Sequence, residues 1–202
     1  MTMLVRDVMT SPVITVAAAC PVRQAIRLLY EHQVTAAPVL DANGDLAGVV
    51  SELDLLRGEF EPDPRATLMP VPAHADPPPP TVADVMTTEV ITVTETTDAT
   101  AAIDLMVAKR VKSLPVRRGD KVVGIISRRD LMGMLARPDE ELRGAVMAGL
   151  HEQYPFGPSW QVSVRDGVAV LTGRSNPYAD GIADVIARTI PGIVRVKHRS
   201  RP

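Results

Sequence analysis

Two short motifs of this sequence carry residue types that could do chemistry, and both have the spacing Ser-x-x-Asp. They are Ser51-x-x-Asp54 and Ser127-x-x-Asp130, and each follows an apolar run that predicts a β-strand. A serine at the start of a helix, followed three residues later by an acidic residue, is typical of a capping box, which needs no ligand. The same carboxylate could also accept the hydroxyls of a ribose, while backbone N–H groups of the first turn face a phosphate. Both interpretations can hold together.

The sequence offers no other catalytic or metal-binding constellation. Asp54 and Asp130 have no partner acid, and no nucleophile–base pair accompanies them, so we expect neither enzyme activity nor a required cofactor. The four histidines share no zinc-ligand spacing, and we therefore expect no metal site. The single cysteine, Cys20, cannot form an internal disulfide and is interpreted as a small buried apolar residue.

Composition narrows the class of protein further. The chain has 202 residues, 46% hydrophobic and 23% charged, with a net charge of -2. These values favour a globular protein over a disordered chain or a broadly basic nucleic-acid binder. No apolar run has the roughly 18 residues of a membrane span, and the first residues lack the apolar core of a signal peptide. We therefore expect a cytoplasmic binding or regulatory protein.

An internal duplication organises the first two thirds of the chain. The run Val5-Arg-Asp-Val-Met-Thr-Ser-Pro-Val-Ile-Thr-Val16 returns as Val82-Ala-Asp-Val-Met-Thr-Thr-Glu-Val-Ile-Thr-Val93, and the register continues to Leu40 and Arg117. After a deletion of one residue, each copy closes with one of the two Ser-x-x-Asp motifs. The repeats are therefore expected to share one fold and to pack against each other.

Each repeat is predicted to have the order strand, helix, strand, strand, helix. The first strands are expected at 13–16 and 90–93, and apolar residues at helical spacing follow at 22–29 and 99–106. A Pro-Val pair begins the next strand, a polar turn follows, and the strands at 46–50 and 122–126 lead into the second helices. Such a unit has a three-stranded sheet with one face that it cannot cover alone.

The rest of the chain divides into a linker and a third domain. The linker, 59–81, is rich in proline and is interpreted as an extended spacer. From 137 to 202 the pattern predicts α-β-β-α-β, with a helix at 139–150, a two-residue turn at Asp166-Gly167 and a last strand at 193–196. Asn176 before Pro177 predicts a helix start, with Ile182, Val185 and Ile186 on its inner face. The predicted domains are thus 1–58, 59–81, 82–136 and 137–202.

The repeated residues resemble a tandem pair of CBS domains. Asp-Val-Met-Thr, the Val-Ile-Thr-Val run, the Pro-Val start and Gly-h-h-Ser-x-x-Asp (h is apolar) occur in this order twice. The resemblance implies a mixed α/β (α+β) fold in which two repeats pair with pseudo-twofold symmetry and bind an adenosine derivative such as AMP, ADP, ATP or S-adenosylmethionine. It also implies a homodimer. The tail, with Val-Arg-Asp-Gly-Val-Ala-Val-Leu-Thr-Gly173 and Pro-Gly-Ile-Val-Arg-Val196, is similar to a BON domain.

The CBS resemblance also implies which residues line two binding clefts. The residues expected to hold the adenine and those expected to hold the sugar come from opposite repeats. One cleft combines Ile91, Val111, Lys112 and Ser113 with Ser51 and Asp54; the other combines Ile14, Val34, Thr35 and Ala36 with Ser127 and Asp130. The four aliphatic residues of this set are equally compatible with ordinary core positions.

Charge is expected to make the two clefts unequal. The second repeat carries eight Lys and Arg residues against four in the first. Lys112 stands where the first repeat has Thr35, and Arg128 and Arg129 stand where it has Glu52 and Leu53. Because cations attract phosphate and Glu52 repels it, we expect phosphate to bind through the second repeat, with Lys112 as the main contact.

The expected function is that of a regulatory sensor, which binds an adenosine nucleotide and signals to the BON-like domain or to an unknown protein effector. One alternative is a dimeric interaction platform with empty clefts. Another uses the basic C-terminal strand, around Arg195 and Arg201, to bind anionic lipid. Nucleic acid is the less favoured polyanion, because the net charge is near neutral and aromatic residues are few.

Overall fold

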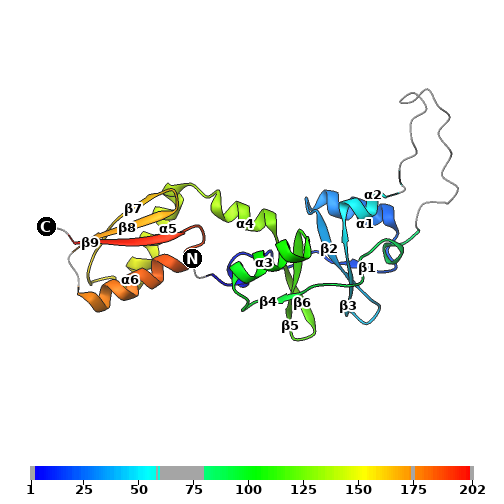
Figure 1. Cartoon of the computed structure of the whole chain (residues 1–202), viewed down its shortest axis with the longest axis horizontal. Coiled ribbons are helices and arrows are strands. Elements are labelled where there is room, and N and C mark those ends of the chain that lie inside the picture. Colours follow the sequence, from blue (N-terminus) through cyan, green and yellow to red (C-terminus); the bar gives the residue numbers. More distant parts are fainter. Residues whose placement is uncertain (1–2, 58, 60–79, 174–175, 201–202) are drawn as a thin grey trace, which may run out of the picture. The chain divides into compact units, whose positions relative to one another are not determined.

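The computed structural model describes residues 3–57, 59, 80–173 and 176–200. These residues form a mixed α+β fold with three-stranded sheets and helices, which confirms the predicted fold class (Figure 1). Nearly all of the predicted proline-rich linker lies outside the described residues. In the described part of the chain, no helix combines the length and the apolar character needed to span a membrane.

The first repeat has the predicted order of strands and helices. It begins with a short 3₁₀ helix, η1, and its sheet has the strand order β1-β2-β3, with β1 parallel and β3 antiparallel to β2. Its elements are η1 (Val5–Asp7), β1 (Val16–Ala17), α1 (Val22–Glu31), β2 (Ala36–Leu40), β3 (Leu46–Ser51) and α2 (Glu52–Leu56).

The second repeat has the same succession of elements, and its sheet has the equivalent order β4-β5-β6. Its α3 helix begins at the N-cap Asp98, whose carboxylate accepts a hydrogen bond from the Thr100 backbone N–H at 2.7 Å. The elements are η3 (Val82–Asp84), β4 (Val93–Thr94), α3 (Ala99–Lys109), β5 (Ser113–Arg118), β6 (Lys121–Ser127) and α4 (Arg128–Leu135).

The first strand of each repeat is shorter and later than the sequence predicts. Parallel pairing begins only at Val16, opposite Val39, and at Val93, opposite Val116. Ile14 and Ile91, which the sequence places inside the predicted strands, therefore lie before the observed strands. A run of β-branched residues favours extended backbone, but only a neighbouring strand can turn that backbone into a sheet ladder.

The described residues form two compact units, and neither unit coincides with one sequence repeat. The first unit contains 3–9, 95–112, 126–173 and 176–200; the second contains 10–57, 59, 80–94 and 113–125. Within the first, the Val5 backbone N–H donates to the Thr97 carbonyl at 2.8 Å. Within the second, the equivalent N–H of Val82 donates to the Cys20 carbonyl at 2.9 Å. The Val-x-Asp-Val-Met-Thr motif of each repeat thus donates a backbone hydrogen bond to the turn that precedes the first α-helix of the other repeat.

A second pair of reciprocal contacts lies inside the second unit. Thr87 forms an isolated antiparallel bridge with Val49 of β3, with both hydrogen bonds at 2.9 Å. Its counterpart Thr10 forms the same bridge with Ile125 of β6, with hydrogen bonds of 2.9 and 3.1 Å. The Met-Thr segment of each repeat (Met9-Thr10 and Met86-Thr87) therefore pairs through one bridge with the third strand of the other repeat.

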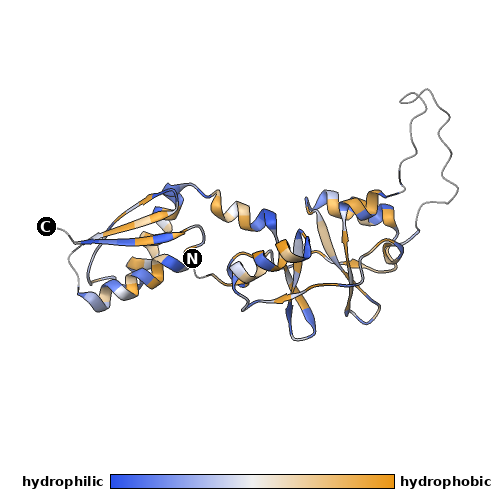
Figure 2. Cartoon of the chain, in the orientation of Figure 1, coloured by the Kyte–Doolittle hydropathy of each residue, from blue (hydrophilic) through white to orange (hydrophobic). Residues whose placement is uncertain are grey.

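The hydrophobic core of the second unit lies between α1, α2 and the first sheet. Its fully buried side chains include Leu29, Val39, Val50 and Leu55. Val82, the first residue of the second Val-x-Asp-Val-Met-Thr motif, is buried in the same core. Figure 2 shows both apolar and polar residues along the helices. Burial of aliphatic side chains on this scale is the main favourable term in folding.

The C-terminal part of the first unit has the predicted order α-β-β-α-β. Its sheet is β7-β8-β9, with β7 antiparallel and β9 parallel to β8. Asp166 and Gly167 have φ values of 50° and 70°, which is the backbone of a tight hairpin turn. The elements are α5 (Asp139–Gln153), β7 (Gln161–Arg165), β8 (Val168–Gly173), α6 (Pro177–Thr189) and β9 (Arg195–Ser200). The last strand, which the sequence predicted at 193–196, thus begins two residues later and ends four residues later than expected.

The inner face of α6 agrees only in part with the predicted one, because Ile186 packs against the core as expected but Val185 does not. Asn176 caps the helix as expected, accepting from the Ala179 N–H at 2.8 Å. The buried residues, however, are the alanines Ala179, Ala183 and Ala187, while Val185 is 61% exposed. Helices α5 and α6 approach so closely that a Cβ on Gly149 would lie 3.0 Å from Ile186 Cγ2. On α6 this contact is made by Ile186, which packs against the core beside the buried alanines, so close packing of the helices and not hydropathy alone selects the buried face.

Candidate functional site

The motif Ser51-x-x-Asp54 joins β3 to α2 as a complete capping box. The Ser51 backbone N–H donates to Asp54 Oδ2 at 2.9 Å, and the Ser51 hydroxyl donates to the same oxygen at 2.6 Å. In return, the Asp54 N–H lies 3.5 Å from Ser51 Oγ. Within the described residues, these contacts use only one carboxylate oxygen, Oδ2. The second oxygen, Oδ1, is left for a further donor such as a sugar hydroxyl.

The second motif repeats this geometry between β6 and α4. The backbone N–H of Ser127 donates to Asp130 Oδ2 at 2.7 Å, its hydroxyl donates at 2.6 Å, and the Asp130 N–H lies 3.3 Å from Ser127 Oγ. The sequence therefore predicted both caps correctly. Asp130 also takes part in a further interaction, so its surroundings are not identical to those of Asp54.

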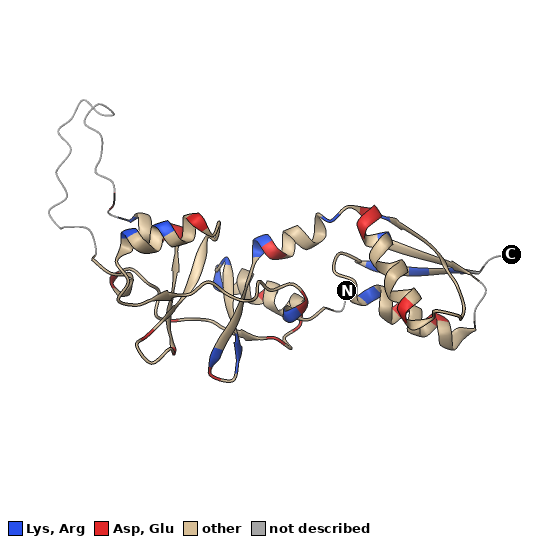
Figure 3. Ribbon diagram, turned by 180° about the vertical axis from the view of Figure 1, so that it is seen from behind, with Lys and Arg blue, Asp and Glu red and all other residues tan. Residues whose placement is uncertain are grey.

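The residue before the second strand of each repeat contacts the start of the capped helix. The Glu52 N–H donates to the Thr35 carbonyl, and the Arg128 N–H donates to the Lys112 carbonyl, both at 3.0 Å. Because the backbone geometry is the same, the difference between the repeats lies in side-chain charge: Glu52 in one, Arg128 and Lys112 in the other. All of these side chains are exposed, and Figure 3 shows basic residues at the start of α4.

The other predicted site residues fall into two groups. The aliphatic residues Ile14, Val34, Ile91 and Val111 are half-buried. Ala36 and Ser113 are the first residues of β2 and β5, and Ala36 pairs with Ser51 across the sheet. Arg129 is exposed in the first turn of α4. Within a single repeat, the structure thus brings the pre-strand residues to the capped helix.

Cys20 has the properties of a neutral thiol. It is partly buried beside the core of the second unit, and its Sγ lies 3.6 Å from the Pro21 carbonyl oxygen. Burial raises the pKa of the thiol above its usual value because it removes water from the charged form. The residue therefore has little thiolate character at neutral pH.

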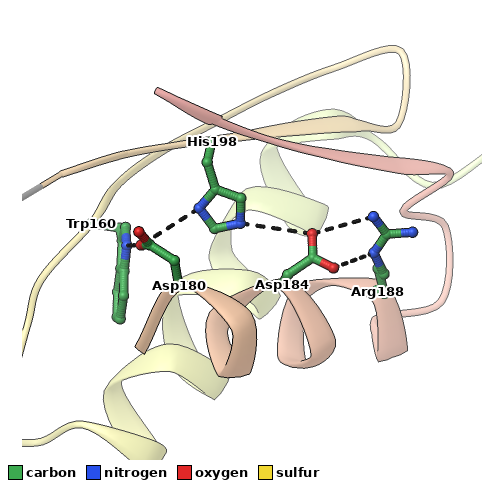
Figure 4. Close-up of polar contacts among 5 residues, drawn as sticks. All are labelled: Trp160, Asp180, Asp184, Arg188 and His198. Atoms are coloured by element: carbon green, nitrogen blue, oxygen red, sulfur yellow. Dashed lines mark hydrogen bonds and ion pairs between the residues drawn. The ribbon is translucent and has the colours of Figure 1, made fainter. Parts of the chain in front are cut away.

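Sequence reasoning missed a polar cluster that joins β9 to α6. His198 lies between two carboxylates, with Nδ1 3.6 Å from Asp180 Oδ1 and Nε2 3.7 Å from Asp184 Oδ1 (Figure 4). Trp160 Nε1 donates to Asp180 at 2.9 Å, and Arg188 forms an ion pair with Asp184. The helical spacing of Asp180, Asp184 and Arg188 was visible in the sequence, but their partners on other elements were not. Among the described residues, no group of three His, Cys, Asp or Glu side chains could hold a metal ion.

Comparison with known proteins shows the family. A model of the CBS domain matches the chain twice, at residues 5–61 and 82–137. The two matches cover more than half of the chain, so the protein belongs to the CBS domain family. This assignment confirms the tandem pair of CBS domains that the duplicated motifs predicted.

Solved structures have the same fold over the CBS region. A CBS domain pair crystallised with 5′-methylthioadenosine and S-adenosyl-L-methionine is 23% identical, covers 66% of this chain and 96% of its own, and has a TM-score of 0.54. CBSX2, crystallised in complex with AMP, is 26% identical, covers 65% of this chain and 94% of its own, and has a TM-score of 0.50. Structures of this family thus include complexes with adenosine compounds.

Curated relatives range from small proteins to enzymes. An uncharacterized 17.7 kDa protein of Acidianus ambivalens is 28% identical over 69% of this chain and 82% of its own length. An inosine-5′-monophosphate dehydrogenase of Methanocaldococcus jannaschii is 29% identical over 62% of this chain, but the match spans only 22% of the enzyme. The shared part is therefore a module that occurs in proteins of different activity.

Proposed function

We propose that this protein is a regulatory sensor without enzyme activity, which binds an adenosine nucleotide through its CBS pair. The observation that carries the proposal is the duplicated capping box, because the cap on Asp54 engages only Oδ2. A carboxylate fixed in this way is preorganised to accept ribose hydroxyls with its remaining oxygen. The complexes of related CBS pairs with AMP and S-adenosylmethionine support the same ligand class.

In the proposed mode of binding, each sugar site is completed by the adenine-binding residues that the CBS resemblance implies. Ile91, Val111, Lys112 and Ser113 serve the sugar site at Asp54. Ile14, Val34, Thr35 and Ala36 serve the one at Asp130. The nucleotide is a regulatory ligand, and no other cofactor is required.

The phosphate is proposed to bind mainly through the second repeat. Lys112 and Thr35 occupy equivalent positions, and each carbonyl accepts the first helical N–H at 3.0 Å. A change of either side chain to alanine therefore leaves an equivalent backbone in place. Lys112→Ala should weaken ATP binding by about tenfold, which corresponds to the loss of one charge-assisted hydrogen bond, and Thr35→Ala should have a smaller effect. Equal losses in calorimetry would contradict the asymmetry.

The ligand itself is tested by isothermal titration calorimetry with AMP, ADP, ATP and S-adenosylmethionine. Asp54→Asn and Asp130→Asn keep an amide oxygen for the cap but remove the charge, and each should weaken binding at its own site by about tenfold or more. Asp104→Asn, which changes an exposed carboxylate on α3, is the matched control and should bind like wild type. Wild-type protein at about 100 times the dissociation constant should gain about 2.7 kcal/mol of stability.

The absence of binding for all four adenosine compounds would refute the sensor proposal and favour the ligand-free dimeric platform. In the sensor, nucleotide occupancy shifts the population between two packings of the CBS repeats or of the homodimer, and the BON-like domain or a protein effector responds. A ligand can shift this population only by its difference in affinity for the two packings.

A second candidate function, binding to anionic lipid, is favoured by one face of the C-terminal sheet. Three cross-strand rows lie on the face opposite the core, and they contain four cations and no acidic residue. The rows are Arg165–Val168–Arg195, Ser163–Val170–Lys197 and Gln161–Thr172–Arg199. Their neighbours in the chain, Val162, Ala169, Leu171 and Val196, face the buried core. Figure 3 shows basic residues along β9.

This basic sheet face suits the flat, negatively charged surface of a membrane. Each Lys or Arg near such a surface contributes about 1 kcal/mol, and the attraction weakens as salt is added. The protein should therefore sediment with phosphatidylserine vesicles and not with phosphatidylcholine vesicles. The variant Arg195→Ser/Lys197→Ser/Arg199→Ser should lose this binding, while Lys109→Ser/Arg110→Ser should keep it. Binding to a fluorescent oligonucleotide in preference to the vesicles would assign the face to nucleic acid instead.

A further inference from the structure

A polar cavity of about 430 Å³ lies within the second unit, on residues that the nucleotide proposal does not use. Three segments line it: the start of β3, the stretch between Thr88 and Thr92, and the hairpin of β5 and β6. The lining residues are Asp45, Leu46, Thr88, Val90, Thr92, Arg117 and Asp120. Ile91, which the nucleotide proposal assigns to adenine, alternates with Val90 and Thr92 and is absent from the lining. The cavity has the size of a small-molecule site.

Arg117 is the one cation of this cavity, and its hydrogen bonding is incomplete. Its Nε atom is fully enclosed and has no hydrogen-bond partner among the described residues. Its Nη2 contacts Asp120 Oδ1 at 3.2 Å, but the Asp120 side chain is 97% exposed. An exposed ion pair of this kind contributes little to stability, so Asp120 can be displaced by a better acceptor. An enclosed N–H without an acceptor is unfavourable, so the groups around Arg117 do not satisfy its hydrogen bonding.

The duplication shows that the fold does not require an arginine here. Leu40 is the counterpart of Arg117 at the end of the equivalent strand, and Ser11, Val13 and Thr15 are the counterparts of Thr88, Val90 and Thr92. The apolar and hydroxyl residues are therefore common to both repeats, and the guanidinium is particular to the second. Because the first repeat has leucine at this position, Arg117→Leu is a suitable substitution for removing the guanidinium.

We propose that this cavity binds a small carboxylate that carries a hydrogen-bond donor, either an amine or a hydroxyl. The guanidinium of Arg117, whose side chain is 35% exposed, donates hydrogen bonds to the carboxylate, which displaces Asp120, and the hydroxyls of Thr88 and Thr92 add hydrogen bonds. Asp45, an exposed carboxylate of the lining, accepts a hydrogen bond from the amine or hydroxyl of the ligand. With two acids and one base, the lining repels ligands of high negative charge. The class is therefore a monocarboxylate and not a polyphosphate.

The proposal is tested by protein NMR on the full chain, with serine, lactate, acetate and inorganic phosphate as probes. Serine or lactate at millimolar concentration should shift the amide signals of Thr88, Thr92 and Arg117, and acetate should bind more weakly because it lacks the donor. Arg117→Leu should weaken the binding by about tenfold or more, as expected for a lost charge-assisted hydrogen bond. Arg118→Leu, which removes a neighbouring charge outside the lining, is the matched control and should bind like wild type.

The outcomes separate this site from the nucleotide site. A stronger response to serine assigns an amino acid, and a stronger response to lactate assigns a hydroxy acid; both support the proposal. No shift with either probe, tighter binding of phosphate, or equal losses in Arg117→Leu and Arg118→Leu would overturn it. Asp54→Asn should leave the carboxylate response unchanged, so failure of nucleotide binding and failure of this cavity are distinguishable.

Discussion

The substitution Gly48→Ala tests the reciprocal contact that joins the two repeats. Gly48 is buried in β3, next to the bridge between Val49 and Thr87. A Cβ added at this position would lie 2.6 Å from Met86 Sδ and 2.9 Å from the Thr87 carbonyl oxygen. The methionine side chain can rotate away. The carbonyl cannot, because it accepts the Val49 N–H at 2.9 Å.

We expect this substitution to reduce the free energy of unfolding by about 2 kcal/mol. Overpacking of a buried site typically costs about 1–3 kcal/mol, and a weakened hydrogen bond adds about 1 kcal/mol. Loss of the glycine's freedom in the unfolded chain offsets roughly 0.4–1 kcal/mol of this. The added methyl group displaces Met86 and Thr87, and the chain continues from there to Ile91, which is proposed to contact adenine. The affinity for an adenosine nucleotide should therefore fall in the same variant.

Urea unfolding followed by circular dichroism measures the effect, and Gly144→Ala is the control. Gly144 lies inside α5, and nothing lies within 4 Å of a Cβ built there. Alanine at this position should therefore stabilise the helix by about 0.5–1 kcal/mol. If Gly48→Ala were as stable as wild type while Gly144→Ala showed its gain, the close approach of Met86 and Thr87 to β3 would be refuted.

Two further expectations concern local features. Asn176→Ala removes the N-cap of α6 and should reduce the stability measured by urea unfolding by about 1 kcal/mol, whereas Asn43→Ala, in an exposed turn, should change it less. An unchanged midpoint in Asn176→Ala would contradict the role of this cap. Because burial raises the pKa of Cys20, its thiol should react with iodoacetamide more slowly at neutral pH than the same thiol in urea, and the rate should rise with pH; equal rates in both conditions would contradict the burial.

The local features of this protein were determined by its sequence. The two Ser-x-x-Asp motifs predicted both capping boxes, because a cap depends on residues only three positions apart. The turn at Asp166 and Gly167 was predictable for the same reason, since few residues tolerate a positive φ. Periodicity gave the order of elements in each repeat and in the C-terminal domain.

Features that depend on distant contacts were decided only by the tertiary structure. β-branched residues at 13–16 could not show that pairing begins at Val16, because the partner strand determines the ladder. Hydropathy favoured Ile182, Val185 and Ile186 for the inner face of α6, but only Ile186 packs against the core, and the fully buried positions are alanines. The cavity around Arg117 joins three segments, at 45–46, 88–92 and 117–120, and no local pattern in the sequence shows that segments so far apart in the chain meet.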